Sequence, residues 1–409
     1  MGPTFQHTFA NGLRLIHIET NGPVAHCGVL INAGSRDEKP GEEGLAHFIE
    51  HVIFKGTKKR KSYHILSRLE DVGGELNAYT GKEETCIYAS FLREDYARSI
   101  ELFGDIIFNS IFPDKEVAKE KDVVIDEILS YKDSPSELIF DDFQELIYAN
   151  HPMGANILGS KKNVKGFTRA QIQNFIQEHY IPENMVISSI GNISGKKLSA
   201  LIEKHFGEAQ SSINIYQRTP LTPYHVITKE VAAKTYQTHC VIGNRAYAAN
   251  DKKRSSLVLL NNLLGGPGMN TRLNLNIREK YGFTYTIESF YTSYSDTGEF
   301  GIYFGTDKDT VKKCMELTLK ELEKLRTAEL GPTQLGKAKK QLMGQIAIGQ
   351  ESNSNYMLSM GKSMLFFNKI DSLEQIQTKI DKIDAKALRD IANEIFAPET
   401  LSTLIYKAK

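Results

Sequence analysis

The two halves of the amino-acid sequence repeat the same order of predicted elements. In the first half, the alternating apolar segment 25–31 predicts a strand, which is followed by an apolar helix over 45–54 and a glycine. In the second half, segment 238–242 leads in the same way to a helix over 255–264 and a glycine pair. Corresponding landmarks lie about 208 to 213 residues apart, a period that indicates a duplicated domain rather than a solenoid.

The repeat continues beyond these helices and sets the predicted architecture. The strand predicted over 85–91 corresponds to the strand over 299–304, and a long helix with an acidic start follows each of them. We therefore predict an α+β fold with two homologous domains, each a mostly antiparallel β-sheet with helices packed on one side. The predicted domains are residues 1–209 and 224–409, joined by a polar linker over 210–223.

Composition excludes several classes of protein. Lys and Arg total 50 and Asp and Glu total 50, and the resulting zero net charge argues against a protein that binds nucleic acid or an anionic membrane surface. No apolar run approaches the roughly 20 residues that span a bilayer, and the first residues show no secretory signal. We expect a soluble cytoplasmic protein, or one in a periplasm or organelle matrix if a leader has been removed. The four scattered cysteines predict buried thiols rather than a metal site.

One motif, His47-Phe48-Ile49-Glu50-His51, carries the strongest chemical signal. On a helix, His47 and His51 are four residues apart, so both imidazoles project from one face and can share one metal ion. Glu50 lies beside them, as in the inverted zinc-protease arrangement, where two histidines bind Zn²⁺ and a glutamate activates its water. The alternative is a pair of core histidines satisfied by hydrogen bonds, next to a surface glutamate.

A catalytic zinc site needs a third protein ligand from another element. The helix predicted over 114–131 offers Glu120 and Glu127, which are seven residues apart and therefore lie on one face, next to an apolar stripe. Spacing alone leaves open that both are ordinary solvated positions of a helix.

Several segments together carry a resemblance to a known family. They are residues 34–38, residues 44–57 around the histidine motif, and residues 73–80, 151–154 and 179–185. In these segments the chain resembles the pitrilysin, or insulinase, family of inverzincin zinc metallopeptidases. It is most similar to the short two-domain members, such as the subunits of the mitochondrial processing peptidase and bacterial homologues.

The resemblance implies a zinc metalloendopeptidase with one Zn²⁺ per chain. It implies that His47, His51 and Glu127 are the metal ligands, because the family's third ligand is a glutamate about 76 residues after the second histidine. It further implies that Glu50 is the catalytic base and that Glu120 supports the metal site.

The resemblance also implies residues that contact the substrate. Asn77 and Ala78 match the family's edge strand, onto which an extended peptide adds as a further strand. Arg278 and Tyr285, in the second half, match an Arg and a Tyr that contact the substrate. Without the family, packing roles at a helix end and in a strand remain the alternative for these last two residues.

The family's closed chamber is built from four such domains, so a chain with two domains implies a dimer. A homodimer is expected, because this chain carries both the metal motif and the Arg278 and Tyr285 pair; a heterodimer is the other arrangement. The alternative function is a non-catalytic scaffold or partner subunit of a heterodimeric peptidase or a larger complex. Nucleic acid and a membrane span are not expected.

Overall fold

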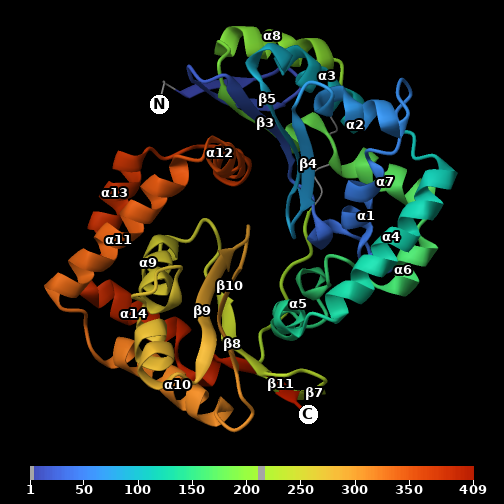
Figure 1. The fold of residues 1–409 in the computed structure, drawn as a ribbon. Coiled ribbons are helices and arrows are strands. Elements are labelled where there is room, and N and C mark those ends of the chain that lie inside the picture. Colours follow the sequence, from blue (N-terminus) through green and yellow to red (C-terminus); the bar gives the residue numbers. More distant parts are fainter. Residues whose placement is uncertain (1–3, 211–216) are drawn as a thin grey trace. The chain divides into compact units, whose positions relative to one another are not determined.

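The computed structural model of the protein describes residues 4–210 and 217–409. Two compact units make up this fold. Unit 1 contains residues 1–129, 155–220 and 349–370, and unit 2 contains residues 130–154, 221–348 and 371–409. Each unit is built around one β-sheet (Figure 1).

The sheet of unit 1 has six strands in the order β1-β2-β6-β3-β5-β4. These strands are β1 (Thr4–Thr8), β2 (Arg14–Glu19), β3 (Val24–Ile31), β4 (Glu75–Thr80), β5 (Thr85–Leu92) and β6 (Met185–Gly191). Only β2 and β6 pair in parallel, and the other neighbours are antiparallel. Strand β4, which follows the histidine motif in the sequence, therefore lies at one edge of the sheet.

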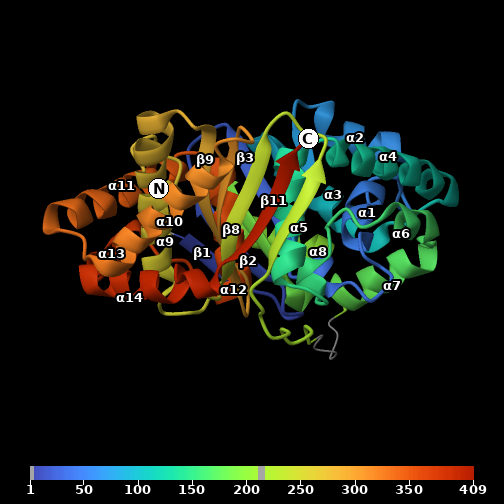
Figure 2. The ribbon, with the colours of Figure 1, turned by 90° about the horizontal axis from the view of Figure 1, so that it is seen from below.

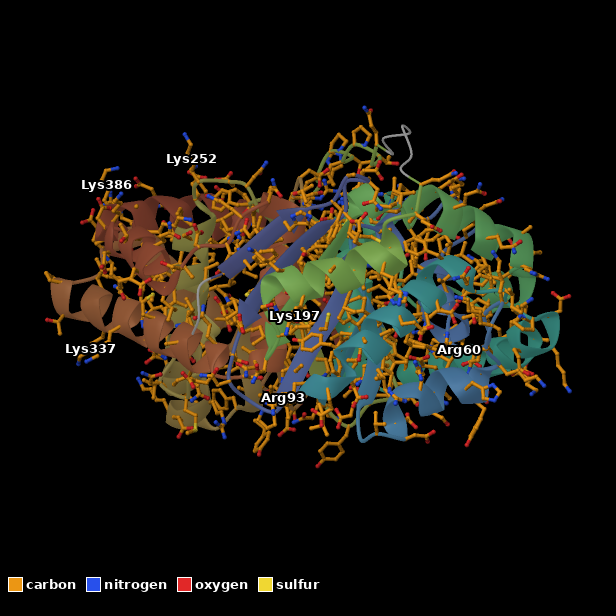
Figure 3. All side chains as sticks on the ribbon, turned by 90° about the horizontal axis from the view of Figure 1, so that it is seen from above. Arg60, Arg93, Lys197, Lys252, Lys337 and Lys386 are labelled. Carbon is orange, nitrogen blue, oxygen red and sulfur yellow. The ribbon has the colours of Figure 1, made fainter. Side chains whose placement is uncertain are left out.

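Both faces of this sheet are covered by helices. Alternate residues such as Leu15 and Val29 point into a core that α3 (Tyr96–Asn109) and α8 (Gly195–Phe206) close, and Figure 3 shows Lys197 on the outer side of α8. Their neighbours Ile16 and Leu30 point to the opposite face, against α12 (Asn353–Phe367). The remaining helices of unit 1 are α1 (Leu45–Val52), α2 (Ser62–Glu70), α4 (Asp114–Lys132, whose last turn is counted with unit 2), α6 (Lys161–Gly166) and α7 (Arg169–His179), with short 3₁₀ turns at Ser35–Asp37, Arg93–Asp95 and Pro182–Asn184.

The sheet of unit 2 has five strands in the order β7-β11-β8-β10-β9. They are β7 (Thr228–Ala233), β8 (Thr238–Ala246), β9 (Thr284–Ser293), β10 (Gly298–Thr306) and β11 (Ser402–Ala408). Only β7 and β11 are parallel; Figure 2 shows β8, β11 and β7 side by side. The helices are α5 (Pro135–Ile147), α9 (Arg254–Gly265), α10 (Val311–Thr327), α11 (Pro332–Gln350), α13 (Leu373–Asp381) and α14 (Ala385–Ile395), with a π-helical turn at Asn274–Glu279 and 3₁₀ turns at Pro152–Gly154 and Pro398–Thr400.

The predicted α+β class with two mostly antiparallel sheets is confirmed. One detail differs, because helices lie on both faces of each sheet rather than on one side. The additional helix comes from the other half of the sequence in each case: α12 packs on β3 and β6 of unit 1, and α5 packs on β8 and β11 of unit 2. Burial drives this exchange, since the second face of each sheet is also apolar and needs a cover.

The contact-based units therefore differ from the predicted continuous domains 1–209 and 224–409 by these two exchanged segments. The division of the sequence at the linker stays a prediction. Of the predicted linker 210–223, residues 211–216 lie outside the described residues. Within the described ranges, no helix has the length and apolar character needed to cross a membrane.

Candidate metal centre

Helix α1 presents the histidine motif, and a buried carboxylate fixes where this helix starts. Gly44 precedes the first turn with a positive φ of 96°, a conformation that favours glycine. The Glu38 carboxylate accepts the backbone N–H groups of Gly44, at 2.9 Å, and of Ala46, at 2.8 Å. These bonds satisfy N–H groups that a helix start leaves without an internal partner. The apolar side chains of α1 are buried in the core of unit 1.

The structure brings His47, His51 and Glu127 together. One donor atom from each lies within 4.8 Å of the others. The Glu127 carboxylate on α4 spans the two rings, with one oxygen 3.7 Å from His47 Nε2 and the other 3.3 Å from His51 Nε2. Tetrahedral zinc with ligands at about 2.1 Å separates its donors by about 3.4 Å. The two nitrogen–oxygen distances lie on either side of this value, so the three side chains fit such an ion.

Glu120 lies behind His51 rather than among these donors. Its carboxylate is buried and contacts His51 Nδ1 at 3.1 Å through one oxygen and Lys55 Nζ at 2.8 Å through the other. A hydrogen bond from Nδ1–H leaves Nε2 as the basic nitrogen, which is the one that faces Glu127. Glu120 was predicted from the sequence, whereas Lys55, which follows α1 and shares no recognisable spacing with Glu120, was not.

Glu50 points to the edge strand β4. Thr80, the last residue of β4, donates its hydroxyl hydrogen to Glu50 Oε2 at 2.6 Å. Burial raises the pKa of the Glu50 carboxyl; the Thr80 hydrogen bond and the His51 ring act in the opposite direction. A carboxylate with a raised pKa exchanges protons more readily near neutral pH. Thr80 was not predicted as a site residue, although its place inside the segment 73–80 was a signal for it.

The His47 ring is held neutral. Burial, and next the neighbouring His51 ring, lower the pKa of His47 to about 4. An imidazole without its second proton keeps a lone pair available for a metal, so no proton competes for this position at neutral pH.

Asn77 and Ala78 lie on β4, next to α1. Among the described residues, β4 pairs only with β5, where Asn77 is opposite Tyr88 and Ala78 is opposite Ile87. The other side of the strand is an unpaired sheet edge, and Asn77 is exposed. An edge of this kind offers backbone N–H and C=O groups to an added strand.

Arg278 and Tyr285 lie together in unit 2. The Arg278 guanidinium lies over the Tyr285 ring, with 5.3 Å between its central carbon and the ring centroid. Its Nη1 also donates to Asn274 Oδ1 at 3.3 Å. The Tyr285 side chain is 79% exposed, so its hydroxyl is open to solvent. Neither a core position nor a buried hydrogen bond accounts for this tyrosine.

In unit 2, no second cluster of metal donors exists among the residues that the structure describes. Ser256 to Leu260, which correspond in the repeat to His47 to His51, lie in α9. The metal-binding pattern is thus restricted to one half of the duplication.

The chain matches two family models in succession. Residues 14–161 match the model described as insulinase, peptidase family M16, and residues 166–342 match the model described as the peptidase M16 inactive domain. The chain is similar to the uncharacterized zinc protease YmxG of Bacillus subtilis, with 31% identity over 98% of this chain and 97% of the relative. An uncharacterized zinc protease of Rickettsia felis is 33% identical over 92% and 91% of the two chains.

Solved structures show the same fold. A protease from Helicobacter pylori superimposes with a TM-score of 0.91 at 24% identity, with both chains fully covered. A peptidase M16 inactive domain from Pseudomonas fluorescens gives 0.92 at 19% identity over 100% of this chain and 98% of that one. With curated relatives of this identity and coverage, the chain belongs to the M16, or insulinase, family of zinc peptidases.

Proposed function

We propose that the protein is a zinc-dependent endopeptidase of the inverzincin type, which hydrolyses peptides or small unfolded polypeptides inside a closed chamber. The observation that carries this proposal is the cluster of His47, His51 and Glu127, with Glu50 beside it. Two imidazole nitrogens and one carboxylate leave a tetrahedral ion one open position, which is the arrangement of catalytic rather than structural zinc. The zinc protease names of the relatives support the choice of metal.

Each chain would hold one Zn²⁺ through these three residues. When bound, zinc supplies an acidified water and polarises a carbonyl. The Glu50 carboxylate accepts a proton from the attacking water and returns it to the departing amine nitrogen. The Thr80 hydrogen bond keeps one Glu50 oxygen on the side of β4, where an added peptide would lie. Glu120 keeps His51 in the tautomer and orientation that a ligand needs.

The substrate would bind by strand addition. An extended peptide paired with β4 contacts backbone groups near Asn77 and Ala78, and such pairing is indifferent to side chains. Arg278 can donate two hydrogen bonds to carbonyl or carboxylate oxygens, and the exposed Tyr285 hydroxyl can support the oxyanion of a tetrahedral intermediate. We infer that a homodimer closes the chamber, with these two residues of one chain serving the metal site of its partner.

The decisive experiment compares the wild type with Glu50→Gln. Both proteins should contain about one zinc per chain, because Glu50 is not a ligand, and cleavage of an unfolded peptide should fall at least about a hundredfold in the variant. The matched control is Glu70→Gln, since Glu70 is an exposed glutamate at the end of α2. Undiminished cleavage by Glu50→Gln would refute the base role. A wild type without zinc would leave the non-catalytic scaffold as the better interpretation.

A further inference from the structure

The turn between β4 and β5 buries three consecutive charged residues. Lys82, Glu83 and Glu84 are only 6%, 0% and 8% exposed. Charges in a hairpin turn normally lie in water, and burial is costly unless each charge has a partner. In this turn each side chain reaches a different part of unit 1, beginning with Lys82, which donates to the Ala155 carbonyl at 2.6 Å. The turn is therefore a junction of several segments.

Glu83 is held by two arginines. Arg36 Nη1 lies 2.5 Å from Glu83 Oε1, and Arg218 Nη1 lies 3.3 Å from the same oxygen. Arg218 also donates to the Glu83 carbonyl at 3.1 Å and to both oxygens of Asp37, at 2.9 and 3.1 Å. Two cations and two carboxylates thus form a neutral buried group. One of its four members, Arg218, comes from the segment that the sequence predicts to be only a linker.

Glu84 is held by the exchanged helix. Lys362 of α12 forms an ion pair with its carboxylate. The Lys362 ammonium also lies over the ring of Tyr79, a β4 residue, at 6.0 Å from the centroid. Residues 349–370 belong to unit 1 although they follow most of unit 2 in the sequence.

The turn connects directly to the groups of the metal centre. Its first residue, Gly81, follows Thr80, whose hydroxyl binds Glu50. Gly81 and Lys82 accept backbone N–H bonds from Ser35 and Arg36, at 3.1 and 2.8 Å. A Cβ on Gly34 would lie 2.3 Å from the Gly81 oxygen, so the two backbones leave no room for a side chain. A shift of the turn would move Thr80, the carboxylate it binds and the peptide-binding edge together.

We propose that Arg218 and Lys362 are positioning residues for Glu50 and the β4 edge, acting through the turn Gly81–Glu84. The proposal rests on the proposed peptidase function for its catalytic consequence. Arg218 lies directly before residue 221, where the chain passes into unit 2. Lys362 lies in the segment 349–370, where the chain has returned to unit 1. The metal motif alone therefore does not complete the site, because its base and its substrate edge are fixed by residues far outside the motif.

The experiment uses the full chain with Lys362→Met, Lys362→Arg and Arg218→Met. Hydrogen exchange measured by mass spectrometry should show residues 75–84 exchanging about tenfold faster in the two Met variants, with little change in β2 or β6. With an unfolded peptide as substrate, kcat should fall about fivefold in Lys362→Met, recover in Lys362→Arg, and fall further in Arg218→Met. Zinc content should equal that of the wild type.

The controls are Lys197→Met and Arg93→Met, which remove exposed basic side chains of the same unit (Figure 3). Neither should change exchange or kcat. Arg218→Met removes the arginine that pairs with Asp37 and leaves Glu83 with Arg36 alone, a loss that can prevent folding. Lys362 is 46% exposed, so its variant decides the question in that event.

A double-mutant cycle tests the route to Glu50. Thr80→Val removes the hydroxyl that binds Glu50, so Lys362→Met should cause no further loss of kcat in that background. Equal losses in both backgrounds would overturn this route. Unchanged exchange over 75–84, or an equal rise throughout the sheet, would overturn the positioning role itself. A wild type without zinc or cleavage would overturn the peptidase proposal, while the exchange data would still decide the positioning role.

Discussion

Helices α1 and α9 occupy equivalent places in the two units. Each follows an inner strand and contacts an edge strand, β4 in unit 1 and β9 in unit 2. Helix α1 presents His47, Glu50 and His51 next to its edge strand. Helix α9 and β9 are instead joined by ordinary hydrogen bonds, from the Ser289 hydroxyl to the Asn261 carbonyl and from Arg254 Nε to the Ser293 hydroxyl. The same scaffold thus carries a metal-binding pattern in one copy and plain packing in the other, so the fold by itself does not make the site.

The largest expected effect comes from changing equivalent positions of these two helices. His47→Ala should weaken zinc binding about a thousandfold and abolish cleavage, because one of three ligands is lost. Ser256→Ala, at the corresponding position of α9, should change neither. Chelator competition measures the affinity. Retained zinc in His47→Ala would mean that the ion is held elsewhere.

The next effect tests whether unit 2 acts on the reaction without binding metal. Tyr285→Phe should lower kcat by about a hundredfold, the usual result of removing an oxyanion donor, with zinc content unchanged. Peptide hydrolysis and metal analysis of the same preparation check this. A variant with normal kcat would leave the exposed tyrosine without a catalytic role.

Mixing two inactive variants tests whether Glu50 of one chain and Tyr285 of its partner serve the same site. If Tyr285 serves the partner's metal site, a mixture of Glu50→Gln and Tyr285→Phe chains should regain about a quarter of the wild-type activity after subunit exchange, since half of the dimers would contain one intact site. Each variant alone provides the background. Activity that stays at that background would place both residues in the same chain's site, or exclude a dimer.

A smaller effect is expected behind the metal ligands. Glu120→Gln should weaken zinc binding by about ten- to a hundredfold, because His51 loses the carboxylate that orients it. Glu321→Gln is the matched change in unit 2, since Glu321 is also a buried helical glutamate with basic partners, Arg272 and Lys324. Its zinc affinity should equal that of the wild type. Equal losses in the two variants would indicate a general effect on stability.

The smallest effect concerns acid stability of the metal-free protein. Burial lowers the pKa of His17 and His47 in unit 1. The unfolded chain therefore binds protons near pH 6.5 that the folded chain does not bind. The contribution of these neutral histidines to the free energy of unfolding is fully present above about pH 6.5 and is lost as the pH falls towards the lower folded pKa.

Among the described histidines, five in unit 1 have a lowered pKa, namely His17, His26, His47, His179 and His205. In the described part of unit 2 the corresponding histidine is His239 alone. Lowering the pH from 7 to 5 should therefore lower the melting temperature of unit 1 by a few degrees more than that of unit 2. Calorimetry measures both transitions. Equal shifts would show that buried histidines do not control the acid response.

Sequence reasoning was sufficient where one element carries the information. The four-residue spacing of His47 and His51 fixes their common face on a helix, and alternation identifies strands such as β3. It was not sufficient for Lys55, Thr80 and Arg218, whose partners lie on separate elements. Their contacts depend on how elements pack, and residue spacing along one chain does not encode that.

Sequence patterns could not predict that α12 and α5 each pack in the unit formed mostly by the other half of the chain. Helix α12 buries methionines and leucines against the sheet of unit 1, but its apolar residues are equally suited to any apolar face. The repeat in the sequence favours two continuous domains, and only the three-dimensional packing decides which sheet such a helix covers.

This exchange has a consequence for how the protein is made. A ribosome releases residues 349–370 only after most of unit 2, so until then Ile16, Leu30 and Val186 of the first sheet have no cover. Unit 1 therefore cannot complete its folding when its own strands emerge, and its apolar face must be kept from aggregating during most of synthesis. The half of the chain that carries the metal motif would emerge first, yet its sheet would gain its second cover only shortly before the last strand of unit 2 is made.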